Sequence, residues 1–247
     1  MKPMTGRTVV ITGPTSGIGR EIAIGLAGLG AELVLGCRDA AKGKAVALEL
    51  ERGAGVSSVE VVPVDLADRK SIERFARKIL DAHARLDVLV NNAGVSRGDQ
   101  PWAKNGDGID VASTFASDLD LDDLQFQRRP YEGMKAYAQS KACDRLLTWA
   151  LARRLEGSGV TANAMAPGLI VDTGLYRHTP PDVMARLRQR GGRTPADGAD
   201  TVVWLASSPD VEGVSGKLFE NRKEIPCSFR GHEAEERLWS TCESLAR

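Results

Sequence analysis

The chain has 247 residues, of which 42% are hydrophobic and 27% charged, a balance typical of a globular protein with one α/β domain. Lysine plus arginine and aspartate plus glutamate both number 33, and a chain without net charge is poorly suited to the phosphate backbone of nucleic acid. The apolar runs are too short to span a membrane, the start has no signal-peptide pattern, and the 4 cysteines and 3 histidines are scattered, so we expect a cytoplasmic protein with no membrane span and no metal site.

Strand-like and helix-like segments alternate through the first half of the chain. The short apolar runs with the length of buried strands are 7–12, 32–36, 59–64 and 86–90. The segments in which apolar residues recur at helical spacing are 17–29, about 39–52 and 71–83. This order predicts a doubly wound α/β fold of Rossmann type, in which a parallel sheet has helices on both faces and ligands bind at the carboxyl ends of the strands.

The second half continues the alternation less regularly. The expected elements are a helix over about 131–156, a strand at 160–165, a looser stretch over 167–195, a helix at 196–207, a strand at 217–219 and a helix over 233–245. No internal repeat or linker interrupts the chain. We therefore predict one dinucleotide-binding domain over residues 1–247, with a cofactor half at 1–94 and a catalytic and substrate-loop half at 111–247.

A glycine-rich turn lies between the first predicted strand and its helix. Residues without a Cβ let the backbone approach a pyrophosphate, and the helix N-terminus adds N–H donors and a partial positive charge. The alternative is a turn that serves only the packing of helix on strand. The predicted cofactor contacts in this turn are Thr12, Gly13, Thr15, Ser16, Gly17, Ile18 and Gly19.

The end of the second predicted strand indicates the form of the cofactor. Sites specific for NAD usually carry an acidic residue there for the ribose 2′-hydroxyl, whereas an arginine suits a 2′-phosphate. Here Arg38 occupies that place and Asp39 follows it. The sequence favours NADP(H) over NAD(H), the alternative being an exposed arginine at the start of a helix.

Tyr137 and Lys141 are four residues apart on the long predicted helix and so share one face. An ammonium group near a phenol lowers the pKa of the tyrosine, which can then exchange a proton with a carbonyl or alcohol oxygen while a nicotinamide carries the hydride. A second pair with the same spacing, Tyr131 and Lys135, lies at the expected start of the helix. We therefore favour the later pair.

These motifs, in this order, resemble those of the short-chain dehydrogenase/reductase family. The turn at 12–19 matches T-G-x-x-x-G-x-G, residues 91–94 match N-N-A-G, and residues 137–141 match Y-x-x-S-K. The resemblance implies further cofactor contacts, from Asp65, Leu66, Asn91, Ala93, Gly94, Tyr137, Lys141, Pro167, Gly168, Ile170 and Thr173. Residues 36–39, 140–155 and 237–239 resemble the retinol dehydrogenase-like and WW-domain oxidoreductase-like branch, which prefers NADP(H).

The chain departs from the family before its fifth expected strand. Only sixteen residues separate Gly94 from Val111, where family members have a full crossover helix with an asparagine of the catalytic site, so roughly thirty residues are absent. In the family that helix commonly lies in the dimer interface, so the sequence does not decide whether this chain forms a homo-oligomer. Ser113 best matches the family serine that orients the substrate oxygen, the alternative being a loop serine without a special role.

Two functions follow from these residues. The first is an NADP(H)-dependent oxidoreductase that interconverts a small-molecule carbonyl and alcohol through Tyr137, Lys141 and Ser113. The second is an NADP(H)-binding protein of the same ancestry whose catalysis is impaired or lost with the crossover helix. The substrate and the direction of the reaction stay open.

Overall fold

The computed structural model describes residues 2–54, 59–94, 119–171, 173–174, 181–227 and 231–246. They belong to two compact units. The described part of the first unit comprises residues up to 94 together with those between 169 and 207, and the described part of the second comprises 119–168 and 208–246. Ser113 and the shortened segment before it lie outside the described residues.

The first unit is built on a parallel four-stranded sheet with the order β3-β2-β1-β4. Its strands are β1 (Thr8–Thr12), β2 (Glu32–Cys37), β3 (Val59–Pro63) and β4 (Val88–Val90). All four lie within the segments predicted from apolar runs or within one residue of them. Because neighbouring parallel strands end at one edge, the residues that follow the four strands gather there.

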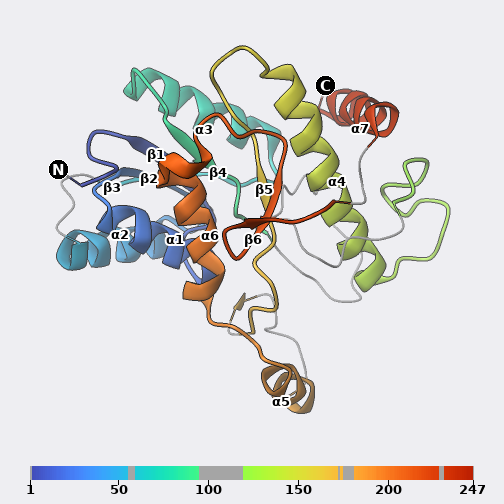
Figure 1. Ribbon diagram of the computed structural model, residues 1–247, viewed down its shortest axis with the longest axis horizontal. Coiled ribbons are helices and arrows are strands. Elements are labelled where there is room, and N and C mark those ends of the chain that lie inside the picture. The colour runs from blue at the N-terminus through green and yellow to red at the C-terminus, as the bar shows by residue number, and fades with distance from the viewer. Residues whose placement is uncertain are drawn as a thin grey trace. The chain divides into compact units, whose positions relative to one another are not determined.

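Helices cover both faces of this sheet (Figure 1). They are α1 (Gly17–Gly28), α2 (Ala40–Ala54) and α3 (Arg69–Ala82). Two later helices belong to the same unit: α6 (Pro195–Ser207) packs on α1, and α5 (Pro181–Gln189) buries none of its residues. Phe75 and Ile79 of α3 pack against Val10 and Val34 on one face. Val9 and the other alternate residues of β1 point to the opposite face, where α1 and α2 contact the strands. The prediction of a Rossmann-type α/β fold is confirmed.

One strand of the sheet is incompletely covered. Leu89 of β4 is in register with Val10 and so lies on the α3 face, where it is 52% exposed. Leu80 of α3 is 74% exposed. In a doubly wound fold this place belongs to the helix that follows the fourth strand.

The second unit joins two long helices to a small sheet. Its elements are α4 (Gly133–Arg154), β5 (Ala164–Met165), the 3₁₀ turn η2 (Pro209–Val211), β6 (Leu218–Glu220), β7 (Lys223–Glu224) and α7 (His232–Leu245). Leu146 and Trp149 of α4 share a buried cluster with Leu218 of β6 and Leu238 of α7. Throughout the described ranges, no helix is both long and apolar enough to cross a lipid bilayer.

Candidate active site

The glycine turn predicted to hold the cofactor connects β1 to α1 in the first unit. Gly13 and Gly17 have φ of +67° and +55°, which side chains rarely adopt. A Cβ on Gly13 would lie 2.8 Å from Cα of Ala93, and one on Gly19 would lie 2.3 Å from Nδ2 of Asn92. Packing within the protein thus accounts for Gly13 and Gly19, so these glycines alone do not identify a ligand.

The start of α1 supplies the feature that packing does not explain. Ser16, the N-cap residue, makes no side-chain capping bond, and the first turn of the helix contains no acidic residue. The N–H groups of a helix start and the positive end of its dipole form a ready site for an anion. This turn therefore has the donors that a pyrophosphate requires.

The loop after β4 is bonded directly to the glycine turn. The hydroxyl of Thr12 accepts hydrogen bonds from the backbone N–H groups of Asn92 and Ala93, both at 3.1 Å. The amide of Asn92 donates to the carbonyl oxygens of Thr12 (2.9 Å) and Gly13 (3.2 Å). Asn92 was not among the predicted contacts, although its place after a strand adjacent to β1 could have indicated this role.

The prediction of NADP(H) rests on the residues that follow β2. Arg38 is exposed, and within the described ranges its side chain forms no ion pair or hydrogen bond. Asp39 instead caps α2 by accepting N–H bonds from Ala41 (3.0 Å) and Lys42 (3.1 Å), and these bonds lower the pKa of its carboxyl group. The acidic residue nearest the strand end is therefore occupied, whereas the arginine is not.

The other predicted cofactor contacts divide between the two units. Asp65, partly buried after β3, accepts an N–H bond from Ala67 at 3.0 Å, and Leu66 packs against the core under α3. In the same unit a Cβ on Gly17 would lie 3.4 Å from Thr173. The remaining first-unit contacts are Thr15, Ile18, Asn91, Gly94 and Ile170. Pro167 and Gly168 belong to the second unit, directly after β5.

α4 in the second unit brings the predicted catalytic pair together. Nζ of Lys141 lies 5.3 Å from the ring centroid of Tyr137, and the lysine side chain is only 4% exposed. The same ammonium is 3.4 Å from Oδ2 of Asp144, which is 9% exposed. A buried ammonium needs such a counter-charge to stay ionised. Asp144 was missed by the sequence analysis, although its spacing of three residues from Lys141 could have indicated it.

The competing pair at the start of α4 is engaged elsewhere. Lys135 forms an exposed ion pair with Glu132 at 2.7 Å. The ring of Tyr131 packs edge-on against Phe126, with centroids 5.5 Å apart. The choice of Tyr137 and Lys141 as the catalytic pair stays a prediction.

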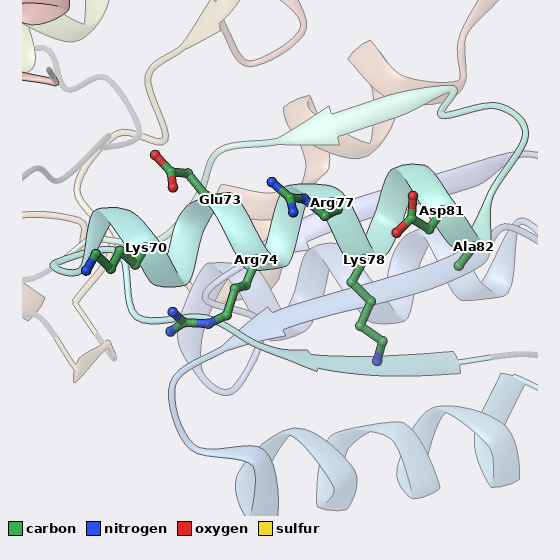
Figure 2. Close-up of a pocket in the computed structure, with 7 residues that line it drawn as sticks. All are labelled: Lys70, Glu73, Arg74, Arg77, Lys78, Asp81 and Ala82. Atoms are coloured by element: carbon green, nitrogen blue, oxygen red, sulfur yellow. The ribbon is translucent and has the colours of Figure 1, made fainter.

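A surface hollow runs along α3, and the residues that line it include none of the predicted site residues (Figure 2). Figure 2 shows Lys70, Arg74 and Lys78 projecting to one side of the helix, whereas Glu73 and other charged residues project to the other. Part of this positive charge is compensated by ion pairs, such as that of Lys78 with Glu60 at 2.9 Å. A solvent-open hollow lined by one helix offers no enclosed place for a reaction.

Comparison with known proteins decides the family. The family model described as short chain dehydrogenase matches residues 7–114. Retinol dehydrogenase 14 of Homo sapiens is 35% identical over 272 aligned positions, which cover 90% of this chain and 80% of that protein. The chain belongs to the short-chain dehydrogenase/reductase family. It is a member of the retinol dehydrogenase-like branch, in a class of oxidoreductases that act on CH–OH groups.

Solved structures agree with this short-chain dehydrogenase fold. A crystal structure of an uncharacterised protein from Mycobacterium paratuberculosis has a TM-score of 0.72 and 28% identity, and the match covers 98% of this chain and 94% of that one. A protein from Beutenbergia cavernae, described as an NAD(P)-dependent gluconate 5-dehydrogenase with bound NADP, has a TM-score of 0.69 and 29% identity, with 89% and 96% covered.

This short-chain dehydrogenase is shorter than its curated relatives over the region they share. The alignment with dehydrogenase/reductase SDR family member 13 of Homo sapiens, at 32% identity, has 281 positions and covers 100% of this chain and 74% of that protein. Since the chain has 247 residues, about 34 of the 281 positions have no counterpart in it. This number agrees with the prediction that roughly thirty residues are absent.

Proposed function

We propose that this short-chain dehydrogenase is an NADP(H)-dependent oxidoreductase that interconverts a carbonyl and an alcohol on a small molecule. The observation that carries the proposal is the placement of Tyr137 beside the buried ammonium of Lys141 on α4. A phenol next to a positive charge gives up its proton more readily. That property suits a group that exchanges a proton with an alcohol or carbonyl oxygen.

The first unit fits a phosphorylated dinucleotide on two observations. The uncapped start of α1 offers N–H donors to a pyrophosphate, and Arg38 offers a guanidinium to a 2′-phosphate. Asp39, which would favour a free 2′-hydroxyl, is held in the cap of α2. When bound, the nicotinamide supplies or accepts the hydride. We therefore propose NADP(H) as the preferred cofactor.

Each side chain of the proposed site has a separate role. Tyr137 donates a proton to the substrate oxygen in reduction and removes it in oxidation. Lys141 holds a positive charge beside the phenol, and Asp144 keeps that charge stable inside the protein. Ser113, which lies outside the described residues, is proposed to orient the substrate oxygen through a hydrogen bond.

Turnover of a panel of aldehydes and ketones, followed by the absorbance of NADPH, tests this function. Tyr137→Phe removes the proton donor, so kcat should fall at least about a hundredfold while NADPH, followed by fluorescence, still binds. Tyr131→Phe is the matched control, because it makes the same change in a tyrosine packed against Phe126, and it should retain turnover. Turnover that survives Tyr137→Phe would refute the assignment.

A second candidate function is NADP(H) binding without catalysis. The roughly 34 alignment positions that this chain lacks favour it, because the loss is expected at the short segment before residue 111, where family members have a helix that carries a catalytic asparagine. It predicts that the chain binds NADPH but oxidises it with no carbonyl in the panel. The same assay therefore separates the two functions.

A further inference from the structure

Gln139 is a buried polar residue of α4 for which the proposed reaction has no role. It lies two residues after Tyr137 and is 3% exposed. Its Oε1 accepts hydrogen bonds from the N–H of Asp120 at 3.0 Å and from Nη2 of Arg129 at 2.6 Å. Its Nε2 donates to the carbonyl oxygens of Leu124 at 3.0 Å and Asp123 at 3.3 Å. One side-chain amide thus uses both its donors and both its acceptor sites on a single preceding segment.

That segment, residues 120–129, is folded around a second buried group. The carboxylate of Asp123, which is 5% exposed as a residue, accepts backbone N–H bonds from Gln127 at 2.6 Å and from Arg128 and Arg129 at 3.2 Å. Arg129 lies over the ring of Phe126 at 4.3 Å. Phe126 itself has φ of +52°. An aromatic residue keeps such a conformation only where its surroundings hold it firmly, and strained positions of this kind cluster at functional sites.

The bonds of Gln139 join this segment to the first two turns of α4. Glu132, the N-cap residue, makes no side-chain capping bond, so the first turn lacks the usual local restraint. Tyr137 lies just beyond that turn. Residues two apart on a helix point about 200° away from each other, so Gln139 holds the helix from the side opposite Tyr137 and Lys141. The amide can therefore fix the catalytic turn without touching the reacting atoms.

We propose that Gln139 is a positioning residue, which clamps residues 120–129 to α4 and thereby fixes the hydroxyl of Tyr137. The role rests on the proposed function, because it assigns Gln139 to the tyrosine of that reaction. A catalytic group displaced by about 1 Å can lose on the order of a hundredfold in rate. The clamp removes that freedom from the turn that carries Tyr137.

Two substitutions of Gln139 remove different numbers of its hydrogen bonds to residues 120–129. Gln139→Leu removes all four hydrogen bonds, whereas Gln139→Glu keeps the two accepted bonds and loses the two donated ones. Gln125→Leu is the matched control, because it makes the same chemical change at an exposed glutamine whose side chain bonds only Gln127 within the described residues. The expected order of kcat is wild type and Gln125→Leu first, then Gln139→Glu, then Gln139→Leu.

The kinetic result must separate positioning from general damage. Gln139→Leu should lower kcat by about ten- to a hundredfold while the Kd for NADPH changes by less than about twofold. Trypsin should cleave after Arg128 on the order of ten times faster in Gln139→Leu, because residues 120–129 are no longer bonded to the side chain at position 139. Equal kcat in wild type and both Gln139 variants would overturn the proposal, as would a rise in the Kd for NADPH that accounts for the whole loss.

One further measurement does not depend on turnover. 3-Fluorotyrosine placed at position 137 should give a single sharp ¹⁹F resonance in wild type and Gln125→Leu, and a broadened or split one in both Gln139 variants. A wild type without turnover removes the proposed function but leaves this result to decide the clamp. An unchanged resonance in both Gln139 variants would overturn the clamp, whatever the activity. If Gln139→Leu does not fold, the Gln139→Glu variant carries the same test.

Discussion

Two acidic residues next to predicted site residues are already occupied by the protein. Asp39 caps α2 and so leaves Arg38 as the free charged group after β2. Asp144 is the counter-ion of Lys141. In one case the acidic residue bonds the start of a helix, and in the other it stabilises a charge that the proposed reaction needs. Their roles follow from bonding partners and could not be read from residue type alone.

Arg38 should decide the preference between the two nicotinamide cofactors. Arg38→Ala removes the proposed charge-assisted bond to the 2′-phosphate, so the Kd for NADPH should rise about ten- to a hundredfold while that for NADH stays within about twofold. Titration of cofactor fluorescence with both cofactors measures the two constants. Arg52→Ala, at the exposed far end of α2, is the control and should change neither. Equal losses for NADPH and NADH would contradict the assignment.

At the scale of elements, one face of α4 holds the predicted catalytic residues and another face packs into the core. One face holds Tyr137 and Lys141, and another packs through Leu146 and Trp149 onto the cluster shared with α7. The four-residue spacing predicted that Tyr137 and Lys141 lie together, because helix geometry is local. The partners of Gln139 could not be predicted, since they depend on how a separate segment folds back onto the helix.

The α4–α7 contact should depend on pH through Glu236. Its carboxylate accepts bonds from Arg154 at 2.7 and 2.8 Å and from Arg153 at 3.3 Å, and these bonds lower its pKa from 4.5 to about 2. A lowered carboxyl pKa contributes stability that is complete above pH 4.5 and is lost as the pH falls through about 2. The stability difference between wild type and Glu236→Gln in urea should therefore shrink across this range.

The control for that titration is Glu212→Gln, an exposed carboxyl in the same unit without an ion pair among the described residues. The stability difference for Glu236→Gln should change more over this pH range than that for Glu212→Gln, because Glu236 bonds Arg153 and Arg154. Equal changes in the two variants would show that these bonds do not stabilise the folded state.

On the scale of the whole molecule, the first half of the chain was predictable and the second only in part. β1 to β4 are short apolar runs, and their length and β-branched residues distinguish them from buried helices. The predicted strand at 160–165 is only Ala164–Met165. The stretch expected to be loose contains α5, because Pro181 stands at the first helical position, where proline is tolerated.

The incompletely covered sheet should bind apolar probes. Leu80 and Leu89 are 74% and 52% exposed. The double variant Leu80→Gln with Leu89→Thr should lower the fluorescence of a bound hydrophobic dye. Its free energy of unfolding should stay within about 0.5 kcal/mol of wild type, as for other exposed positions. Leu48→Gln, at a leucine 51% exposed on α2, is the control and should lower the fluorescence less. An equal decrease of fluorescence in the double variant and in Leu48→Gln would show that the dye does not bind at Leu80 and Leu89.

The bonds between Thr12 and Asn92 also bear on how the chain matures. The two residues are separated by 80 positions, so the cofactor turn has no locally complete form. A nascent chain that has emerged only as far as β3 carries every glycine of the turn and the carbonyl of Gly36 that bonds Gly13, but it lacks Asn92 and Ala93, which bond the turn from the loop after β4. A dinucleotide can therefore stabilise the folded chain only after β4 has been synthesised and has paired with β1. A ribosome-bound fragment that ends before Asp87 should not be protected from proteolysis by the dinucleotide.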